Sequence, residues 1–430
     1  MWQLKPLLLL AAVSLGALAC TVAGGKPVVT AISKDPATLL YGMGAPVMEH
    51  GGPTNQIVLD LSGPLIWINC PDDRVALECT SVACMQAHRF DPTNCPHAAT
   101  GKPDDPRHCN CTSYPHNPVS GETASGDMTQ VTTYANATDG KNPLYVVPVE
   151  LTTSCAPVSL FAGLPEGAVG VVGLGRSALA LPAQVTKTQK VDNTFALCLP
   201  GGSGNTGVAI FGGGPLFLLP PGGPDIAASL VGYTPLVKHG ESPGYYISAE
   251  KGIAVNHVTV PLDGGAYGAT PLLVGLSLTI PYTALRSDVY GAFIKAFDEA
   301  TAGYARMPAV APFELCYDST QLGSTRVGYP VPEIELMLAG GKSWILFGGN
   351  SMVDVNDHTA CLAFVEMKGE GKQAGYGGGG RTEAPAMVIG GFQMENNLLV
   401  FDDKNQRLGF SSLLFFRQTT CSNFNFTMAA

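Results

Sequence analysis

Charged residues are scarce in this sequence, and basic residues are the scarcer kind. Asp, Glu, Lys and Arg make up 13% of the 430 residues, and 34 acidic against 24 basic residues give a formal net charge of −10. An acidic, weakly charged chain has no electrostatic footprint for nucleic acid or for an anionic membrane. We therefore expect no nucleic-acid partner and no membrane partner.

Long apolar runs are absent from the sequence beyond its N-terminus. Lys5 precedes an apolar stretch over residues 7–18, and small residues follow at Ala19 and Ala23. This pattern is typical of a signal peptide, because the stretch is too short and too close to the N-terminus for a membrane span. We predict a signal peptide over residues 1–23, cleaved after Ala19 or near Ala23, and a secreted, extracellular mature protein.

The twelve cysteines follow no standard metal-binding spacing, and in an exported chain cysteines usually form disulfides. The disulfide candidates are Cys70, Cys79, Cys84, Cys95, Cys109, Cys111, Cys155, Cys198, Cys316, Cys361 and Cys421. If Cys20 leaves with the signal peptide, at least one remaining thiol is unpaired or pairs between chains. The alternative is a zinc site drawn from Cys84, His88, Cys95, His97, His108 and Cys109. No standard zinc site has this spacing, so we expect no metal and no other cofactor.

Three acceptor sequons fit the same secretory route. They are Asn110-Cys111-Thr112, Asn136-Ala137-Thr138 and Asn425-Phe426-Thr427. We therefore predict N-glycosylation at Asn110, Asn136 and Asn425. The first sequon is a poorer acceptor if Cys111 forms its disulfide before the glycan is attached.

Short β-rich runs, separated by the 52 glycines and 33 prolines, indicate an all-β protein with few helices. The runs richest in β-branched and aromatic residues cover 56–61, 64–68, 145–149, 207–211 and 397–401. The best helical pattern covers 287–297, with Ser287 as the expected N-cap. Residues 212–224 are rich in Gly, Pro and Leu, and we expect them to connect two halves.

The segment 58–67, Val-Leu-Asp-Leu-Ser-Gly-Pro-Leu-Ile-Trp, resembles the first active-site strand of pepsin-like aspartic proteases. In that family an apolar pair precedes Asp-Thr-Gly-Ser, and a Trp follows. Further landmarks occur in the family's order at 173–176, 181–184, 195–199, 211–213, 233–236, 388–391 and 407–410. The resemblance implies a bilobal, all-β pepsin-like fold of two β-barrel-like lobes. We place these lobes at 24–225 and 226–430.

Catalysis in that family needs two carboxylates, one from each half, that share a single proton. Asp60 supplies the first. The second is expected about a dozen residues before Val289, where this sequence has Ser277, and no Asp or Glu lies between Gly264 and Arg286. A serine hydroxyl stays protonated, so Asp60 and Ser277 form a degenerate pair. We predict that the protein is not an enzyme and has no catalytic residues.

Two supporting parts of the catalytic machinery also differ from the family pattern. Leu61 and Ser62 stand where the family has Thr-Gly. In the family the Thr hydroxyl braces the two loops and the Gly allows close approach of the substrate, and Leu61 can do neither. The flap, usually Tyr-Gly-Asp-Gly, reads Tyr-Pro-His-Asn-Pro-Val-Ser-Gly over 114–121. Both differences agree with a loss of proteolytic activity.

Longer phrases resemble the TAXI-type xylanase inhibitors and their basic-7S-globulin relatives, a plant group within the same family. The phrases cover 34–38, 58–60, 117–121, 181–185, 208–215, 350–355 and 363–369. The resemblance implies a monomeric plant-defence protein of the apoplast and cell wall. Its partner would be a secreted microbial endo-xylanase of glycoside hydrolase family 11, or a related cell-wall-degrading glycosidase.

The inhibitory side chains of those relatives are not retained at the matching positions. A His after the closing Gly-Phe-Ser corresponds to Phe415, which is followed by Phe416, and a Leu after Cys-Tyr-Asp corresponds to Arg326. As inhibitor-loop candidates, Phe415 could stack in a sugar-binding cleft and Arg326 could pair with carboxylates. The run 413–416 could equally be a core strand.

Two other functions stay open. The first is an aspartic-type endopeptidase with residual activity, against which the missing second Asp argues. The second is a basic-7S-globulin-like protein that binds peptides or serves as a store, against which the acidic charge balance argues.

Overall fold

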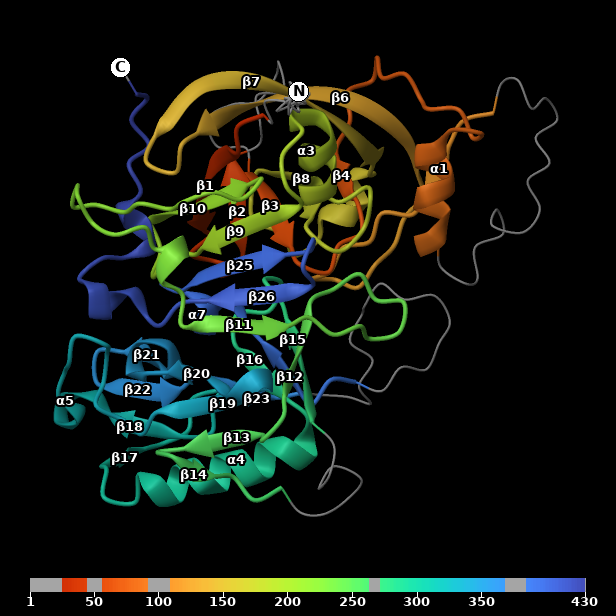
Figure 1. Cartoon of the computed structure of the whole chain (residues 1–430). Helices are drawn as coiled ribbons and strands as arrows, with labels where there is room; N and C mark the ends of the chain where they lie inside the picture. The colour runs from red at the N-terminus through yellow and green to blue at the C-terminus, as the bar shows by residue number, and fades with distance from the viewer. Residues whose placement is uncertain (1–24, 45–55, 92–108, 263–270, 368–383, 430) are drawn as a thin grey trace, which may run out of the picture.

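The computed structural model describes residues 25–44, 56–91, 109–262, 271–367 and 384–429 (Figure 1). The predicted signal peptide, Cys20 and Cys95 lie outside the described residues. None of the helices in the described ranges has the length and apolar character that a membrane span requires.

Thirteen strands form one large sheet, in the order β11-β26-β25-β9-β10-β1-β2-β3-β8-β4-β7-β6-β5. The strands from the first half are β1 (Val28–Lys34), β2 (Tyr41–Gly44), β3 (Gln56–Asp60), β4 (Ile66–Ile68), β5 (Thr112–Ser113), β6 (Gly126–Thr138), β7 (Pro143–Cys155), β8 (Ala168–Gly173), β9 (Thr194–Cys198) and β10 (Thr206–Phe211). The helices of this half are α1 (Val82–Ala87), η1 (His88–Phe90), η2 (Val158–Phe161) and α3 (Leu181–Gln189). In the figure the long β6–β7 ribbon arches over this lobe.

The second half forms three smaller sheets of four or five strands and contributes three strands to the large sheet. Its strands are β11 (Gly232–Pro235), β12 (Tyr246–Ala249), β13 (Ile253–Val255), β14 (Val258–Thr259), β15 (Leu272–Leu276), β16 (Thr283–Leu285), β17 (Arg306–Met307), β18 (Cys316–Asp318), β19 (Ile334–Leu338), β20 (Lys342–Leu346), β21 (Met352–Asn356), β22 (Thr359–Leu362), β23 (Phe364–Glu366), β24 (Met387–Ile389), β25 (Leu398–Asp402) and β26 (Arg407–Phe410). Its helices are η3 (Ala227–Ser229), α4 (Ser287–Ala300), α5 (Ser319–Leu322), η4 (Ala339–Gly341), α6 (Gly348–Ser351), α7 (Gly391–Met394), η5 (Leu414–Arg417) and η6 (Cys421–Asn423).

The predicted all-β, two-lobed architecture is confirmed, and each of the five β-rich runs contains a strand. The predicted helix forms as α4, but the expected N-cap at Ser287 is wrong. Arg286 is the N-cap, with extended φ/ψ, and Ser287 is already the first helical residue. The Arg286 guanidinium instead pairs with Asp288 in the first turn, at 2.7 Å. Asp288 thus lies at the positive end of the helix dipole, where a negative charge is favourable.

The two halves are joined through the large sheet. β9 of the first half pairs antiparallel with β25 of the second, and the Phe195 and Phe401 rings stack with centroids 4.6 Å apart. A disulfide between Cys198 and Cys421 closes the same junction. The boundary at residue 225 stays a prediction, since strands on both sides of it share one sheet.

Five disulfides are formed by the described cysteines. They join Cys70 to Cys155, Cys79 to Cys109, Cys84 to Cys111, Cys198 to Cys421, and Cys316 to Cys361. Every candidate cysteine within the described ranges therefore forms a disulfide, as predicted, although the sequence did not indicate the pairing. Cys95 is the remaining candidate, outside the described ranges.

Candidate functional site

Asp60 lies at the end of β3, where the chain leaves the large sheet. Its side chain is buried, and Oδ1 accepts hydrogen bonds from both the N–H and the hydroxyl of Ser62, each at 2.8 Å. Oδ2 has no hydrogen-bond partner among the described residues. Burial raises the pKa of Asp60, because the charged form is poorly solvated, although the bonds from Ser62 act in the opposite direction. The site therefore holds an isolated, buried acid.

Ser277 follows β15 in the second half and repeats this local geometry. Its Oγ accepts a hydrogen bond from the Thr279 N–H at 3.2 Å and lies 3.0 Å from the Thr279 hydroxyl. Its own N–H donates to the Ile389 carbonyl at 3.0 Å, and the residue is 7% exposed. In both turns the side chain at one position is held by the N–H and hydroxyl two residues later. Only the turn in the first half carries a carboxyl group.

Tyr245 connects the two turns through the interior. Its carbonyl accepts a hydrogen bond from the Leu276 N–H at 3.1 Å, next to Ser277. Its hydroxyl lies 3.1 Å from the Leu174 carbonyl oxygen and 3.0 Å from Asp403 Oδ2, and the Leu174 N–H donates to the Asp60 carbonyl at 2.8 Å. The fold thus brings the loops of Asp60 and Ser277 together around one buried tyrosine. The Ser277 turn contributes no carboxyl group to this centre, whereas the shared-proton pair of an aspartic protease needs one from each turn.

The segment in the flap position is fastened to the first lobe. The Trp67 indole N–H donates to the His116 carbonyl at 3.0 Å. The buried Asn117 side chain donates to the carbonyls of Leu160 and Ala162, at 2.7 and 2.9 Å. These bonds explain the Asn-Pro-Val-Ser-Gly phrase as a structural turn, since the amide of Asn117 satisfies two buried carbonyls.

Arg326 lies at the tip of an exposed turn in the second half. The turn is closed by a hydrogen bond from the Thr325 N–H to the Gly328 carbonyl at 2.9 Å, and the Thr325 hydroxyl donates to the same oxygen at 2.7 Å. The Gly349 N–H donates to the Val327 carbonyl at 2.7 Å. The turn is therefore held at its base, while the Arg326 side chain is exposed.

The Phe415 and Phe416 candidates lie on η5, so the alternative of a core strand is wrong. Leu413 and Leu414 are buried, whereas Phe415 is half-buried and Phe416 is 50% exposed. Apolar residues in a short 3₁₀ helix point in different directions, and the run is therefore divided between core and surface.

The two candidate loops meet on one segment, 347–349. The Phe416 ring lies edge-on to the Phe347 ring, with centroids 4.9 Å apart. The Gly349 N–H donates to the Val327 carbonyl, which belongs to the Arg326 turn. Gly349 also lies next to Leu413, since a Cβ added at Gly349 would be 3.6 Å from Leu413 Cδ2. Segments that are well separated in sequence therefore share a support, which sequence reasoning did not foresee.

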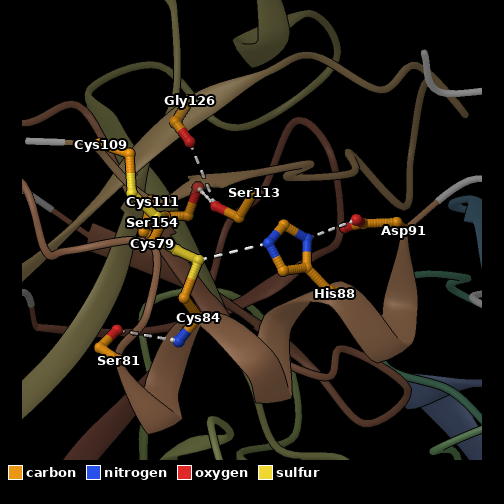
Figure 2. Close-up of a disulfide and its surroundings, with 10 residues drawn as sticks. All are labelled: Cys79, Ser81, Cys84, His88, Asp91, Cys109, Cys111, Ser113, Gly126 and Ser154. Carbon is orange, nitrogen blue, oxygen red and sulfur yellow. Dashed lines mark hydrogen bonds and ion pairs between the residues drawn. A yellow bond between two sulfur atoms is a disulfide. The ribbon is translucent and has the colours of Figure 1, made fainter. Parts of the chain in front are cut away.

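The cysteine-rich region of the first lobe contains two disulfides rather than a zinc site at Cys84 and Cys109 (Figure 2). Figure 2 also shows His88 between Cys84 and Asp91. Its Nε2 lies 3.3 Å from Cys84 Sγ, and its Nδ1 lies 2.6 Å from Asp91 Oδ2. The sulfurs of Cys84 and Cys109 are both consumed in disulfides, which removes them as metal ligands.

The sequon asparagines differ in accessibility. Asn110 is exposed and adjoins the disulfide-bonded Cys111. Asn136 is half-buried in β6 and is paired with Val29 on one side and Val146 on the other. Asn425 is half-buried, and its Oδ1 accepts a hydrogen bond from the Thr427 N–H at 3.1 Å. Glycosylation stays a prediction at all three. It is least favoured at Asn136, which lies within paired strands, because acceptor sequons lie in surface loops.

A buried ion pair between the two halves was missed by the sequence analysis. Lys34 Nζ lies 2.6 Å from Glu395 Oε1, and both side chains are less than one-tenth exposed. The Tyr41 hydroxyl donates to the same oxygen at 2.6 Å. The phrase at 34–38 contained Lys34, but no local pattern pointed to its distant partner.

Two β-rich lobes that meet at paired turns, one carrying Asp60, define the pepsin-like class of proteins. The chain matches the xylanase inhibitor N-terminal domain over residues 47–213 and the xylanase inhibitor C-terminal domain over residues 244–412. It therefore belongs to the xylanase-inhibitor family of pepsin-like proteins, as the sequence analysis predicted.

Relatives and solved structures agree with this family. Chitinase CLP of Oryza sativa subsp. japonica is 57% identical over 412 residues, which cover 94% of this chain and 93% of the relative. The crystal structure of edgp is 32% identical with a TM-score of 0.77, and the match covers 94% of this chain and 98% of that one. Basic 7S globulin from soybean is 27% identical with a TM-score of 0.73, over 94% and 100% of the two chains.

Proposed function

We propose that the protein is a secreted, catalytically inactive aspartic-protease homologue that inhibits microbial family 11 endo-xylanases in plant defence. The observation that carries the proposal is the convergence of the Arg326 turn and η5 on the segment 347–349. The matched xylanase inhibitor domains and the exposed side chains of Arg326 and Phe416 support it. We propose a monomer that acts in the apoplast.

The absence of proteolysis follows from the chemistry at Asp60 and Ser277. Proteolysis needs a carboxylate that activates water and a second carboxyl group that donates a hydrogen bond. Here the only acid of the pair is 1% exposed, and its counterpart carries a hydroxyl group. Without a second carboxyl group the pair cannot share a proton, which is why we expect no proteolysis.

The inhibitory contact would be made by a mixed aromatic and cationic surface. The Arg326 guanidinium can form two parallel hydrogen bonds with a catalytic carboxylate of a glycosidase. Phe416 and the half-buried Phe415 can stack against aromatic rings that line a sugar-binding cleft. Because Arg and aromatic residues dominate binding hot spots, a few side chains here can supply most of the affinity.

The test is a titration of the purified protein against several family 11 xylanases, with xylan hydrolysis as the readout. We expect Arg326→Ala and Phe416→Ala each to weaken inhibition at least tenfold, about 1.4 kcal/mol. The exposed Arg89 on η1 supplies a matched control, and Arg89→Ala should inhibit like the unsubstituted protein. Full xylanase rates at saturating protein would refute the proposal.

Chitin hydrolysis is a second candidate, favoured by one observation: the relative at 57% identity is named a chitinase. Colloidal chitin incubated with the purified protein gives the direct measurement, as release of reducing ends. A soluble product from chitin together with unaffected xylanases would favour this candidate. If neither readout moves, the basic-7S-globulin-like role gains support.

A further inference from the structure

A cavity of about 970 Å³ opens at the junction of the two halves, beside the Arg326 turn. The residues that determine its chemistry are Lys34, Tyr282, Tyr329, Asp354, Phe392 and Glu395. In Figure 1 the second-half elements β21 and α5, which contribute to this wall, lie at the left edge of the lower lobe. The volume is at the upper end of the roughly 300–1,000 Å³ typical of ligand pockets, so it can hold more than a single small ring.

The ion pair of Lys34 and Glu395 forms a preorganised part of the wall. Lys34 and Tyr41 both donate to Glu395 Oε1, and no described residue donates to Oε2. Burial raises the pKa of Tyr41 well above its usual range, and the nearby negative charge of Glu395 raises it further. The Tyr41 hydroxyl therefore remains a hydrogen-bond donor. Because Oε1 holds two donors, Oε2 is the Glu395 oxygen that remains for a ligand hydroxyl.

The residues that line the cavity include three aromatic side chains, Tyr282, Tyr329 and Phe392. The Tyr282 and Phe392 rings are 5.8 Å apart in an edge-to-face arrangement. The Tyr329 hydroxyl donates to Asp354 Oδ1 at 2.6 Å, which fixes the orientation of both side chains. Ser203, Ser319, Thr320 and Ser324 add hydroxyl groups to the rim. The lining of the cavity therefore combines aromatic rings with hydrogen-bonding groups.

The charges of the wall select against anionic ligands. Lys34 is the cation among the cavity-lining side chains of the described structure, and Glu395 neutralises it, while Asp354 leaves one uncompensated negative charge. A lipid chain is also disfavoured, because carboxylates and hydroxyls would be buried without partners. A neutral molecule that carries many hydroxyls and has apolar ring faces satisfies both requirements.

We propose that this cavity binds a short neutral oligosaccharide of the kind released from cell-wall polysaccharides. Its sugar rings would lie against Tyr282 and Phe392, and its hydroxyls would donate to Glu395 Oε2 and Asp354. Binding at this cavity requires neither xylanase inhibition nor chitin hydrolysis, so each can fail without the others.

Isothermal titration with chitohexaose and with xylohexaose tests the proposal and distinguishes the two sources. We expect saturable binding of at least one, weakened about tenfold or more by Asp354→Ala and by Tyr282→Ala. Asp354 is exposed, so its removal should leave folding intact, which a melting curve checks. A hexamer of galacturonic acid should bind far more weakly because of its charge.

The matched control is Tyr145→Ala, because Tyr145 is 50% exposed on β7 and does not line the cavity. This variant should bind like the unsubstituted protein. The proposal is overturned if neither neutral hexasaccharide binds. It is also overturned if Asp354→Ala and Tyr282→Ala, both folded, bind as tightly as Tyr145→Ala.

Discussion

The hydroxyl and the backbone N–H of Ser62 both donate to Asp60 Oδ1. Asp60 Oδ2 is buried without a hydrogen-bond partner in the described structure. In a working pair the second oxygen would face a neighbouring carboxyl group and a water molecule. The serine at position 62, which replaces a family glycine, thus holds the surviving acid in place. The arrangement has direct consequences for stability.

Asp60→Asn should stabilise the protein at neutral pH. The pKa of Asp60 is raised by burial, so its contribution to stability is fully present below the unfolded pKa, near 3.9, and is lost as pH rises through the folded pKa. We expect the variant to be more stable than the unsubstituted protein at pH 7 and little changed at pH 3.5. Thermal unfolding at both pH values measures this. An equal effect at both would contradict the assignment.

Ser62→Ala should have the opposite effect. It removes one of the two hydrogen bonds to Asp60 Oδ1 and leaves the buried carboxyl less well compensated. A lost bond to a charged group costs about 1.5–3 kcal/mol. We expect a lower melting temperature at pH 7, with a smaller loss at pH 3.5, where Asp60 is protonated. A loss that does not depend on pH would point to packing instead.

Ser277→Asp should not create a protease. It supplies the missing carboxyl, but Leu61 still lacks the bracing hydroxyl, and position 277 is 7% exposed. We expect casein hydrolysis at pH 3–5 to stay at background and the melting temperature at pH 7 to fall relative to Ser277→Ala. A second buried carboxylate accounts for this fall. Pepstatin-sensitive cleavage by the variant would show that Ser277 alone had blocked catalysis.

The parts of the fold that the sequence predicts are local ones. Residues 56–60 form β3 because an apolar, β-branched run is buried on both faces of a sheet, and this pattern is legible without a partner. The pairing of β9 with β25 depends on long-range register, for which no sequence neighbour carries a signal. The Ser287 prediction also failed for a physical reason: Ser287 is already helical, and the negative charge at the start of α4 comes from Asp288 in the first turn.

The candidate site divides in the same way. Asp60 and Ser277 could be found because each lies in a recognisable phrase, and the turns that hold them are local. The shared support of the Arg326 turn and η5 could not be found, since Gly349 is an ordinary glycine in the sequence. The Lys34–Glu395 pair is equally hidden, because its two residues are brought together only by the folded sheet.

The disulfide between Cys198 and Cys421 should contribute more to stability than the one between Cys84 and Cys111. It spans 223 residues, against 27 for the other, and a longer loop loses more chain entropy in the unfolded state. The entropy relation gives roughly 5 kcal/mol for the long loop and roughly 4 kcal/mol for the short one. Cys198→Ala/Cys421→Ala should therefore melt below Cys84→Ala/Cys111→Ala. The reverse order would indicate that the first lobe limits unfolding.

Removal of Lys34 should expose the cost of a buried, unpaired carboxylate. Lys34→Met leaves Glu395 with the Tyr41 hydroxyl alone, and breaking such a pair costs about 3–5 kcal/mol. Lys34→Met/Glu395→Gln removes both charges and should recover much of that loss. Lys404 supplies the control, because it pairs with Asp192 where both side chains are 64% exposed. Lys404→Met should cost less than about 1 kcal/mol. Chemical denaturation of the four proteins measures the differences, and equal losses for both Lys variants would contradict the buried pair.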